Sequence, residues 1–343
     1  MIKILKKNVA DKIAAGEVIE RPVSIVKELV ETSIDAGAKS ITVEIKNGGK
    51  TFIRVTDDGC GIPPDEAETA FFRHATSKIE NASDLGEIRT LGFRGEALAS
   101  IAAVTNTTLI TKTSDKKEGC RLSLHGGEII EKTALGCPDG TTVISTDLFY
   151  NMPARREFLK NDGAESSLIV SFVSEMALAY AGVKFQLINN GRILFATQGG
   201  GNLKNTIYEV YRQREYRELI EIEDREEDYD ITGCVSKPSL SRSTRRDQVF
   251  FVNGRVVKSR IMEKGLSEGY RERLFEGRYP VAFIFINVDP GTIDVNIHPN
   301  KKEVRFHDEK FISGIIEKAV KASLSEDGAV IEMGDYFPAN DTP

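Results

Sequence analysis

The sequence predicts an α+β protein of two domains. Its 343 residues exceed the usual size of one domain, which suggests two. Helical and strand patterns of apolar residues follow one another up to residue 196, and a new set begins after Gln198-Gly199-Gly200-Gly201-Asn202. Such a glycine run is typical of a linker. We therefore expect a first domain over residues 1–200, a second over 201–328, and the start of an interdomain linker over 329–343.

The composition excludes several classes of protein. Hydrophobic residues make up 40% and charged residues 29% of the chain, which is ordinary for a globular protein. No apolar run is long enough to span a bilayer, and the N-terminus lacks the apolar core of a signal peptide. The four cysteines have no CxxC spacing, so neither structural zinc nor a disulfide framework is predicted. With a net charge of −6, any contact with nucleic acid must come from a local basic patch.

The first predicted element is a helix over residues 22–35. Pro22 suits a first helical position, four apolar residues recur at helical spacing, and Gly37 can end the helix. The expected elements after it are strands at 40–46 and 51–56, joined by a turn at Asn47-Gly48-Gly49, a helix at 64–72, a helix at 94–104, several strands up to Thr146, helices at 154–160 and 164–180, and a strand pair within 184–196.

The second domain is predicted from a contrast of charge as well as from periodicity. Residues 218–230 hold eight carboxylates and one arginine, whereas 242–260 hold six Lys or Arg and only one acid, Asp247. Asn253-Gly254 predicts a hairpin turn between strands 249–252 and 255–257. The remaining expected elements are a helix at 261–274, a buried strand at 281–288 and a helix at 308–325.

Four short segments have residue types suited to chemistry, although each alone is better explained by an ordinary structural role. Glu28, Thr32 and Asp35 share one helix face, where a carboxylate and a hydroxyl could hold a water and a metal; the alternative is a solvated face. Asp57-Asp58-Gly59-Cys60-Gly61 could present a carboxylate to the amino group of a flat heterocycle; the alternative is an acidic turn.

The other two segments are a glycine loop and a polar strand entry. Gly92-Phe93-Arg94-Gly95 opens a predicted helix, whose free N–H groups and dipole suit a phosphate. The spacing is neither that of a P-loop nor that of a dinucleotide-binding fingerprint, so the signal is weak. Gly140-Thr141-Thr142-Val143 carries no signal by itself.

In this order and spacing, the four segments resemble the ATP-site motifs shared by DNA gyrase, the ninety-kilodalton heat-shock chaperones, sensor histidine kinases and MutL. The closer resemblance is to the MutL family of DNA mismatch repair proteins, and it runs from about residue 1 to 325. Further matching blocks are Lys12–Pro22, Lys27–Glu31, Asp35–Ala38, His74–Lys78, Gly92–Ser100, Phe149-Tyr150-Asn151 with Pro153–Arg156, Phe251–Arg255 and Asp294–Pro299.

The resemblance implies ATP and Mg²⁺ as cofactors and a role for each matching residue. Glu28 corresponds to the general base that activates water against the γ-phosphate, and Asp57 to the reader of the adenine amino group, with Thr142 close by. Gly61 would give the ring room. Residues 73–95 correspond to an ATP lid, whose ends Thr76-Ser77-Lys78 and Gly92-Phe93-Arg94-Gly95 fold over the phosphates. Lys301 corresponds to a lysine of the second domain that reaches the γ-phosphate.

Thr32 departs from the family, which has asparagine there as the Mg²⁺ ligand. A threonine hydroxyl can also bind Mg²⁺, but it is shorter and aimed differently. The departure therefore bears on Mg²⁺ affinity and turnover rather than on nucleotide binding, and we expect weak rather than absent ATP hydrolysis. The alternative is an ATP-gated matchmaker with little or no hydrolysis.

The basic stretch predicts DNA binding that is independent of sequence and sensitive to salt. Arg260 corresponds to a family arginine that contributes to DNA binding; Arg255 and Lys258, with Arg242, Arg245 and Arg246, would add phosphate contacts. The alternative is a solvated charged surface.

The resemblance also implies an architecture and partners. It predicts an ATPase sandwich of helices on a mixed sheet, followed by a transducer domain like ribosomal protein S5. ATP would order the lid and an arm at Leu5–Ile13 and bring two copies into a homodimer, which meets a mismatch-recognition protein and downstream repair enzymes in the cytoplasm, at the nucleoid. The family protein has a further C-terminal domain, so this chain is expected to be a fragment. A gyrase-like topoisomerase subunit fits the Phe93–Leu98 and Asn253–Arg255 blocks less well.

Overall fold

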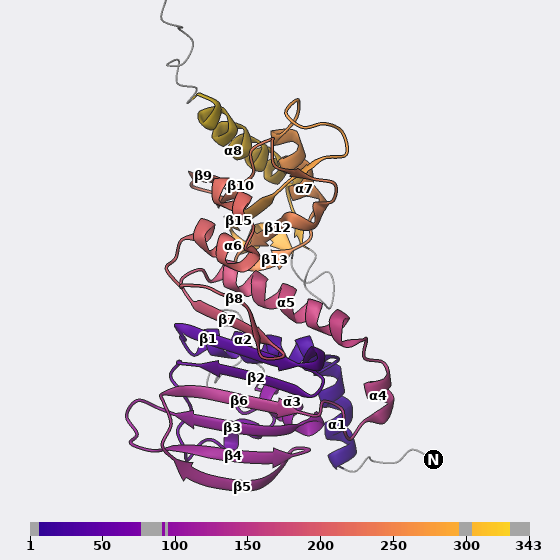
Figure 1. Cartoon of the computed structure of the whole chain (residues 1–343), viewed down its shortest axis with the longest axis vertical. Coiled ribbons are helices and arrows are strands. Elements are labelled where there is room, and N and C mark those ends of the chain that lie inside the picture. The colour runs from indigo at the N-terminus through magenta and orange to yellow at the C-terminus, as the bar shows by residue number, and fades with distance from the viewer. Residues whose placement is uncertain (1–6, 77–90, 93–94, 295–303, 330–343) are drawn as a thin grey trace, which may run out of the picture. The chain divides into compact units, whose positions relative to one another are not determined.

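The computed structural model describes residues 7–76, 91–92, 95–294 and 304–329 (Figure 1). The chain divides into two compact units, the first ending at Asn202 and the second starting at Leu203. Within the described part of the chain, no helix combines the length and the apolar character that a bilayer span requires.

The first unit is built on an eight-stranded mixed sheet with the order β5-β4-β3-β6-β2-β1-β7-β8 (Figure 1). Neighbouring strands are antiparallel except β1 and β7, which run parallel. The strands are β1 (Ser40–Lys46), β2 (Phe52–Asp57), β3 (Asn106–Lys112), β4 (Gly119–His125), β5 (Glu128–Leu135), β6 (Gly140–Thr146), β7 (Lys184–Asn189) and β8 (Arg192–Ala196).

Helices cover one face of this sheet. Those that contact its strands are α2 (Pro22–Asp35), α3 (Ala97–Val104) and α5 (Asp162–Ala179), and the unit also contains α1 (Lys7–Val18) and α4 (Pro153–Glu157). Strands β1 and β2 alternate, with Ile41, Val43, Ile45, Ile53 and Val55 buried. Helix α2 packs on β1, β2 and α5, while α1 packs on α3. The predicted sandwich of helices on a mixed sheet is therefore confirmed.

Several boundaries in the first unit differ from the predictions. The prediction of a helix at 64–72 is wrong, because only a 3-10 turn forms there, at Thr69–Phe71. In this segment only the side chains of Ala67 and Phe71 are buried. One turn of apolar contact does not stabilise a longer helix. Helix α3 begins at Ala97 rather than Arg94, because Gly95 has φ +62°, which a right-handed helix does not allow. From Lys7 on, the expected arm belongs to helix α1.

The predicted glycine linker packs on the first unit. The N–H of Gly201 donates to the carbonyl of Ala181 at 3.0 Å. Gly199 has φ +70°, and a Cβ there would lie 2.7 Å from the nitrogen of Lys184. These contacts hold the glycine run against the first unit, next to the start of β7.

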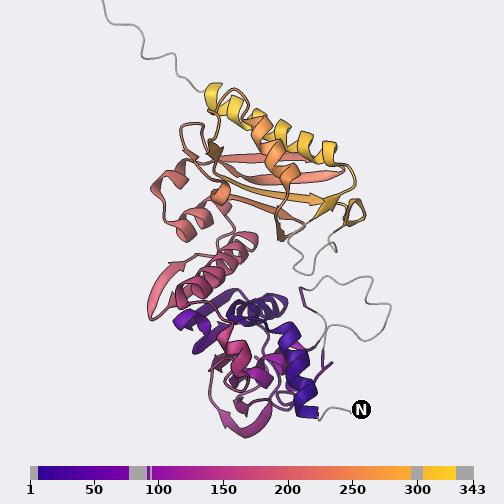
Figure 2. The same ribbon diagram turned by 90° about the vertical axis from the view of Figure 1, so that its right-hand side faces the viewer.

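The second unit has a five-stranded sheet with the order β13-β12-β15-β10-β9. Figure 2 shows α7 and α8, orange and yellow, side by side over it. The ring centroids of Tyr216 and Phe283 lie 6.1 Å apart in an edge-to-face arrangement. Because side chains alternate between the two faces of a strand, Phe283 lies on the face of the sheet opposite to the residues that pack against the helices. The elements are α6 (Leu203–Tyr211), β9 (Ile220–Glu226), β10 (Tyr229–Val235), β11 (Ser241–Arg242), β12 (Gln248–Val252), β13 (Arg255–Val257), α7 (Arg260–Gly269), β14 (Tyr279–Pro280), β15 (Ala282–Val288), β16 (Ile293–Asp294), β17 (Arg305–Phe306) and α8 (Glu309–Ala329).

The hairpin, the buried strand and the last helix of the second unit form where the sequence predicts them. The turn has Asn253 at φ +48° and Gly254 at φ +76°, the left-handed pair that a two-residue hairpin needs. Helix α7 ends at Gly269 instead of continuing to residue 274, because the chain turns at Glu272, which has φ +68°.

Candidate nucleotide-binding site

One face of helix α2 carries the first candidate residues. Glu28 is partly buried and Thr32, one turn later, is exposed. The Thr32 hydroxyl donates to the backbone carbonyl of Glu28 at 2.7 Å. This bond uses the only hydroxyl proton and leaves the oxygen lone pairs as acceptors. Thr32 can therefore offer an oxygen, the ligand type that Mg²⁺ takes, although with a shorter reach than an asparagine amide.

Asp57, the last residue of β2, is held by three donors. Its Oδ2 lies 2.7 Å from the Ser33 hydroxyl, and its Oδ1 accepts from the N–H of Gly59 at 3.0 Å and of Thr141 at 3.2 Å. Burial raises the pKa of the Asp57 carboxyl, and the hydrogen bonds from Ser33, Gly59 and Thr141 offset part of that rise. A partly desolvated carboxylate at a strand end is a candidate ligand contact.

Ser33 joins the two halves of this site, and no sequence motif marks it as a functional residue. Its side chain is buried and follows Thr32 on α2, so it faces the sheet while Thr32 faces outward. The bond to Asp57 ties the helix that carries Glu28 to the strand that carries the adenine candidate. Asp58, next along the chain, has a different role: its Oδ1 accepts from the N–H groups of Lys39 and Ser40 at 2.7 and 2.8 Å.

Thr142 does not lie beside Asp57, contrary to the prediction. Asp57 pairs with Thr141 across β2 and β6, so these two side chains share one face of the sheet. Thr142 is on the opposite face, where its hydroxyl bonds that of Thr56 at 3.1 Å. Thr141 takes the expected place: its N–H bonds Asp57 and its hydroxyl lies 3.1 Å from that of Thr111.

Two glycines near Asp57 are required by close backbone approach. Gly140 has φ +107°, and a Cβ there would lie 2.1 Å from the Asp57 carbonyl oxygen. Gly61 has φ +71°, and its Cβ would lie 2.2 Å from the Lys112 carbonyl oxygen. Strands β2, β3 and β6 thus meet at the strand end that carries Asp57.

The described ends of the expected lid lie next to one another. Asp35 accepts from the N–H of Leu91 at 2.9 Å and of Gly92 at 3.1 Å. Gly95, with φ +62°, approaches Ala75 so closely that a Cβ would lie 2.4 Å from the Ala75 carbonyl oxygen. Helix α3 begins two residues later. Thr76 is described, whereas Ser77, Lys78, Phe93, Arg94 and Lys301 lie outside the described residues.

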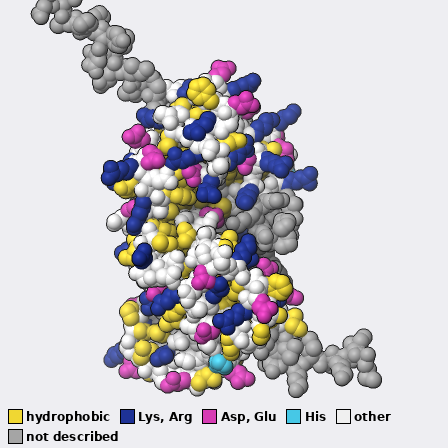
Figure 3. All heavy atoms as spheres, turned by 45° about the vertical axis from the view of Figure 1, so that its right-hand side comes forward, with side chains coloured by type: hydrophobic (Ala, Val, Ile, Leu, Met, Phe, Trp, Pro, Cys, Tyr) yellow, Lys and Arg dark blue, Asp and Glu magenta, His cyan; other side chains and the backbone are white. Residues whose placement is uncertain are grey.

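The basic residues of the second unit fall into two groups. Arg255 on β13, Lys258 after it and Arg260 at the start of α7 are exposed. Figure 3 shows Lys and Arg side chains projecting over one face of the molecule. Arg242 and Arg245 are paired with other side chains of the same unit, which compete with the predicted phosphate contacts. Arg242 bonds Asp247 at 3.0 Å and Gln213 at 2.6 Å, and Arg245 pairs with Glu263.

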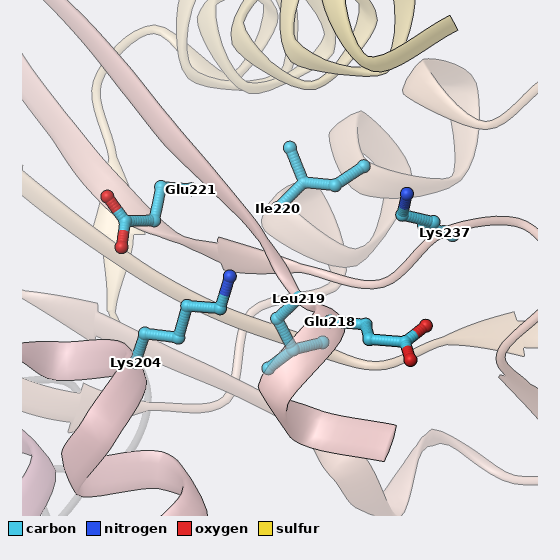
Figure 4. Close-up of a pocket in the computed structure, with 6 residues that line it drawn as sticks. All are labelled: Lys204, Glu218, Leu219, Ile220, Glu221 and Lys237. Carbon is cyan, nitrogen blue, oxygen red and sulfur yellow. The ribbon is translucent and has the colours of Figure 1, made fainter. Parts of the chain in front are cut away.

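A hollow of about 440 Å³ in the second unit is not suited to a nucleotide. Figure 4 shows that two lysines and two glutamates surround it, so opposite charges cancel and a polyphosphate gains no net attraction. Its lining residues are Lys204, Glu218, Leu219, Ile220, Glu221 and Lys237. The constellation around α2, β2 and β6 remains the stronger candidate.

Comparison with known proteins gives matches in both units. Residues 20–134 match the family model described as histidine kinase-, DNA gyrase B- and HSP90-like ATPase, and residues 207–325 match that of the DNA mismatch repair protein C-terminal domain. The second match accords with the expected S5-like fold. The chain is 44% identical over 342 residues to the DNA mismatch repair protein MutL of Agathobacter rectalis, covering 100% of this chain and 52% of that relative.

Two solved structures are similar over most of the chain. One, a crystal structure of the N-terminal domain of a DNA repair protein, has a TM-score of 0.76 and 28% identity and covers 94% of this chain and 99% of that one. The other, the Aquifex aeolicus MutL ATPase domain complexed with ADP, has a TM-score of 0.62 and 27% identity and covers 80% and 94%. The chain spans about half the length of the curated relatives it matches.

Proposed function

Because this chain belongs to the MutL family of DNA mismatch repair proteins, we propose that its first unit binds ATP with Mg²⁺ and hydrolyses ATP slowly. The observation that supports this best is Asp57, a partly buried carboxylate at a strand end, bonded to Ser33 and to the Thr141 N–H. Equilibrium titration with ATP tests the proposal, with saturable binding as the expected result. An absence of binding with and without Mg²⁺ would contradict it.

Each residue of the site has a proposed role. Asp57 accepts a hydrogen bond from the adenine amino group, and Glu28 accepts the proton of the water that attacks the γ-phosphate. Thr32 lies one turn from Glu28 and offers its hydroxyl oxygen to Mg²⁺, which neutralises phosphate charge when bound. The N–H groups at the start of α3 face phosphate oxygens. For Ser77, Lys78, Phe93, Arg94 and Lys301, phosphate contacts are proposed from the family alone.

Thr32→Asn is expected to raise the rate of ATP turnover by about tenfold. The longer asparagine side chain places its amide oxygen where the family has a Mg²⁺ ligand, and contacts around a metal change activity by roughly 10- to 100-fold. Steady-state phosphate release at saturating ATP and Mg²⁺ measures it. ATP affinity without Mg²⁺ should stay the same, which serves as the control. Equal turnover in the two proteins would show that Thr32 does not limit hydrolysis.

The alternative is an ATP-gated matchmaker with little or no hydrolysis. The exposed Thr32, with its proton committed to the Glu28 carbonyl, is the feature that favours it. A wild-type chain that binds ATP and closes without releasing phosphate would support this alternative. A gyrase-like activity is less well supported, since the chain shares 44% identity with a MutL protein.

We also propose DNA binding by the second unit, through Arg255, Lys258 and Arg260. These side chains are exposed on one sheet edge and the adjoining helix start, and β9, at the opposite edge, is acidic. Contact with the phosphate backbone makes the affinity independent of sequence and steeply dependent on salt.

Arg260→Glu is expected to weaken binding of duplex DNA at low salt by about tenfold and to reduce the slope of log affinity against log salt by about 1, because one phosphate contact is lost. Fluorescence anisotropy over a series of salt concentrations measures both. Arg225→Glu makes the same charge change on β9 and should have little effect. Equal losses from both variants would indicate a general charge effect and contradict a contact at Arg260.

Homodimerisation on ATP binding, with Leu5–Ile13 as the arm, is proposed from the family. Sedimentation with and without a non-hydrolysable ATP analogue and Mg²⁺ tests it, and a monomer in both conditions would contradict it. Coupling to a mismatch-recognition protein and downstream repair enzymes, in the cytoplasm at the nucleoid, is proposed for the whole protein.

A further inference from the structure

Asp35 is the last residue of helix α2, and the helix dipole disfavours a carboxylate at a C-terminal end. Exposed backbone carbonyls make the C-terminal end of a helix negative, so acids are favoured in the first turn and bases in the last. Helix α5 follows that rule, with Asp162 and Glu165 in its first turn, whereas α2 has no basic residue in its last turn. The stability of α2 alone does not explain an acid at this position.

The Asp35 carboxylate instead holds two consecutive backbone N–H groups from a distant part of the chain. Its Oδ1 accepts from Leu91 at 2.9 Å and its Oδ2 from Gly92 at 3.1 Å. Hydrogen bonds to an ionised carboxylate are about twice as strong as neutral ones. The pair fixes both the position and the direction of the Leu91–Gly92 peptide.

A second close contact holds the chain at Gly95. Gly95 lies against the backbone of Ala75, and helix α3 begins at Ala97. Asp35 is seven residues after Glu28, two turns along the same face of α2. Helix α2 therefore carries the proposed general base, Glu28, and at its end Asp35, which binds the chain shortly before the start of α3, where phosphate binding is proposed.

We infer that Asp35 is a positioning residue: it holds the Leu91–Gly92 peptide at a fixed place relative to Glu28, so that polyphosphate is bound where the base can act. The inference rests on the proposed nucleotide binding of the first unit. It concerns the phosphate half of the site only, because Asp57 and its partners form separate hydrogen bonds.

Asp35→Asn is the test. Asparagine keeps one acceptor oxygen and turns an amide donor toward the other N–H, so one hydrogen bond is lost and the other is no longer charge-assisted. We expect ATP and ADP affinities to fall by about tenfold, the scale of one such bond, while adenosine affinity stays the same. Competition against a fluorescent adenine nucleotide gives all three constants. The ratio of ADP to adenosine affinity is the readout that a general loss of stability would not move.

Glu165→Gln is the matched control. Glu165 is a buried carboxylate in the same unit whose Oε1 accepts from the Lys160 N–H at 2.9 Å, outside the proposed site. The control should leave the ratio of ADP to adenosine affinity unchanged. Asp35→Glu, which keeps the charge but shifts the oxygens by one methylene, should lower the ratio less than asparagine does and provides the readout if Asp35→Asn does not fold.

The outcomes separate this inference from the function on which it rests. A wild-type chain that binds neither ATP nor adenosine would overturn both. A wild-type chain that binds both, with variants at Asp35 whose ratio of affinities equals the wild-type value, would overturn the positioning role and leave the nucleotide site intact.

Discussion

Glu28→Gln is expected to lower ATP hydrolysis by about 10²- to 10⁴-fold, the range that a positioned general base contributes. Glutamine keeps the size of the side chain and its place on α2 but cannot accept a proton from water. ATP affinity should change little, because the adenine contacts and the α3 amides do not depend on the Glu28 charge. Single-turnover hydrolysis under saturating protein, with ATP affinity measured in parallel, separates the two effects.

Glu31→Gln provides the control for that experiment. Glu31 lies on the same helix and approaches Lys27 at 3.9 Å, so the substitution removes an equal charge within one turn of Glu28. Its hydrolysis rate should stay close to that of the wild-type chain. Comparable losses in both variants, or a Glu28→Gln rate near the wild-type value, would show that Glu28 is not the base.

Asp57→Asn is expected to reduce ATP affinity by about 10- to 100-fold, the cost of losing a hydrogen bond to a charged acceptor. The unliganded protein should be as stable as the wild type or more so, because burial of the Asp57 carboxylate opposes its charge. Asparagine can keep the Ser33, Gly59 and Thr141 contacts, with the Ser33 hydroxyl turning to accept. Calorimetric titration and thermal unfolding measure both quantities; a variant that binds ATP like the wild type would exclude Asp57 from the site.

The pH dependence of the wild-type chain follows from the same carboxyl group. Its pKa in the folded protein is raised above 3.8, so the folded state binds the proton more tightly than the unfolded state. The stability from this group is full below 3.8 and is lost as pH rises through the folded pKa. ATP affinity has the opposite dependence, weakening as pH falls through that pKa, since a protonated oxygen no longer accepts. Asp57→Asn should lack both dependences.

The sequence predicts best those elements whose local signals agree with their packing. Helix α2 and strand β1 have the predicted bounds because the apolar spacing, Pro22 and Gly37 act together with the buried faces that the structure shows. The helix expected at 64–72 has helical residue types but little to pack against. Helix boundaries at Gly95 and Glu272 depend on left-handed backbone angles that a single sequence does not reveal.

The site shows the same division between local and tertiary information. Residue types mark Glu28 and Asp57, but the choice between Thr141 and Thr142 depends on which face of β6 meets Asp57. Ser33 and Asp35 act through partners 24 and 56 residues away, so their roles appear only in the folded chain. Arg242 and Arg245 resemble DNA contacts in sequence, yet the fold pairs them with nearby acids.

The most direct test of the nucleotide site is a comparison of ATP with GTP by calorimetric titration of the wild-type chain. The Asp57 carboxylate accepts hydrogen bonds, so it can bind the amino group of adenine. At the same position guanine has a carbonyl oxygen, which has no proton to donate to the carboxylate. The site predicts saturable binding of one ATP per chain and at least about tenfold weaker binding of GTP, the cost of leaving a buried acceptor unpaired. Equal affinities for the two nucleotides, or no ATP binding at all, would contradict the assignment of this site.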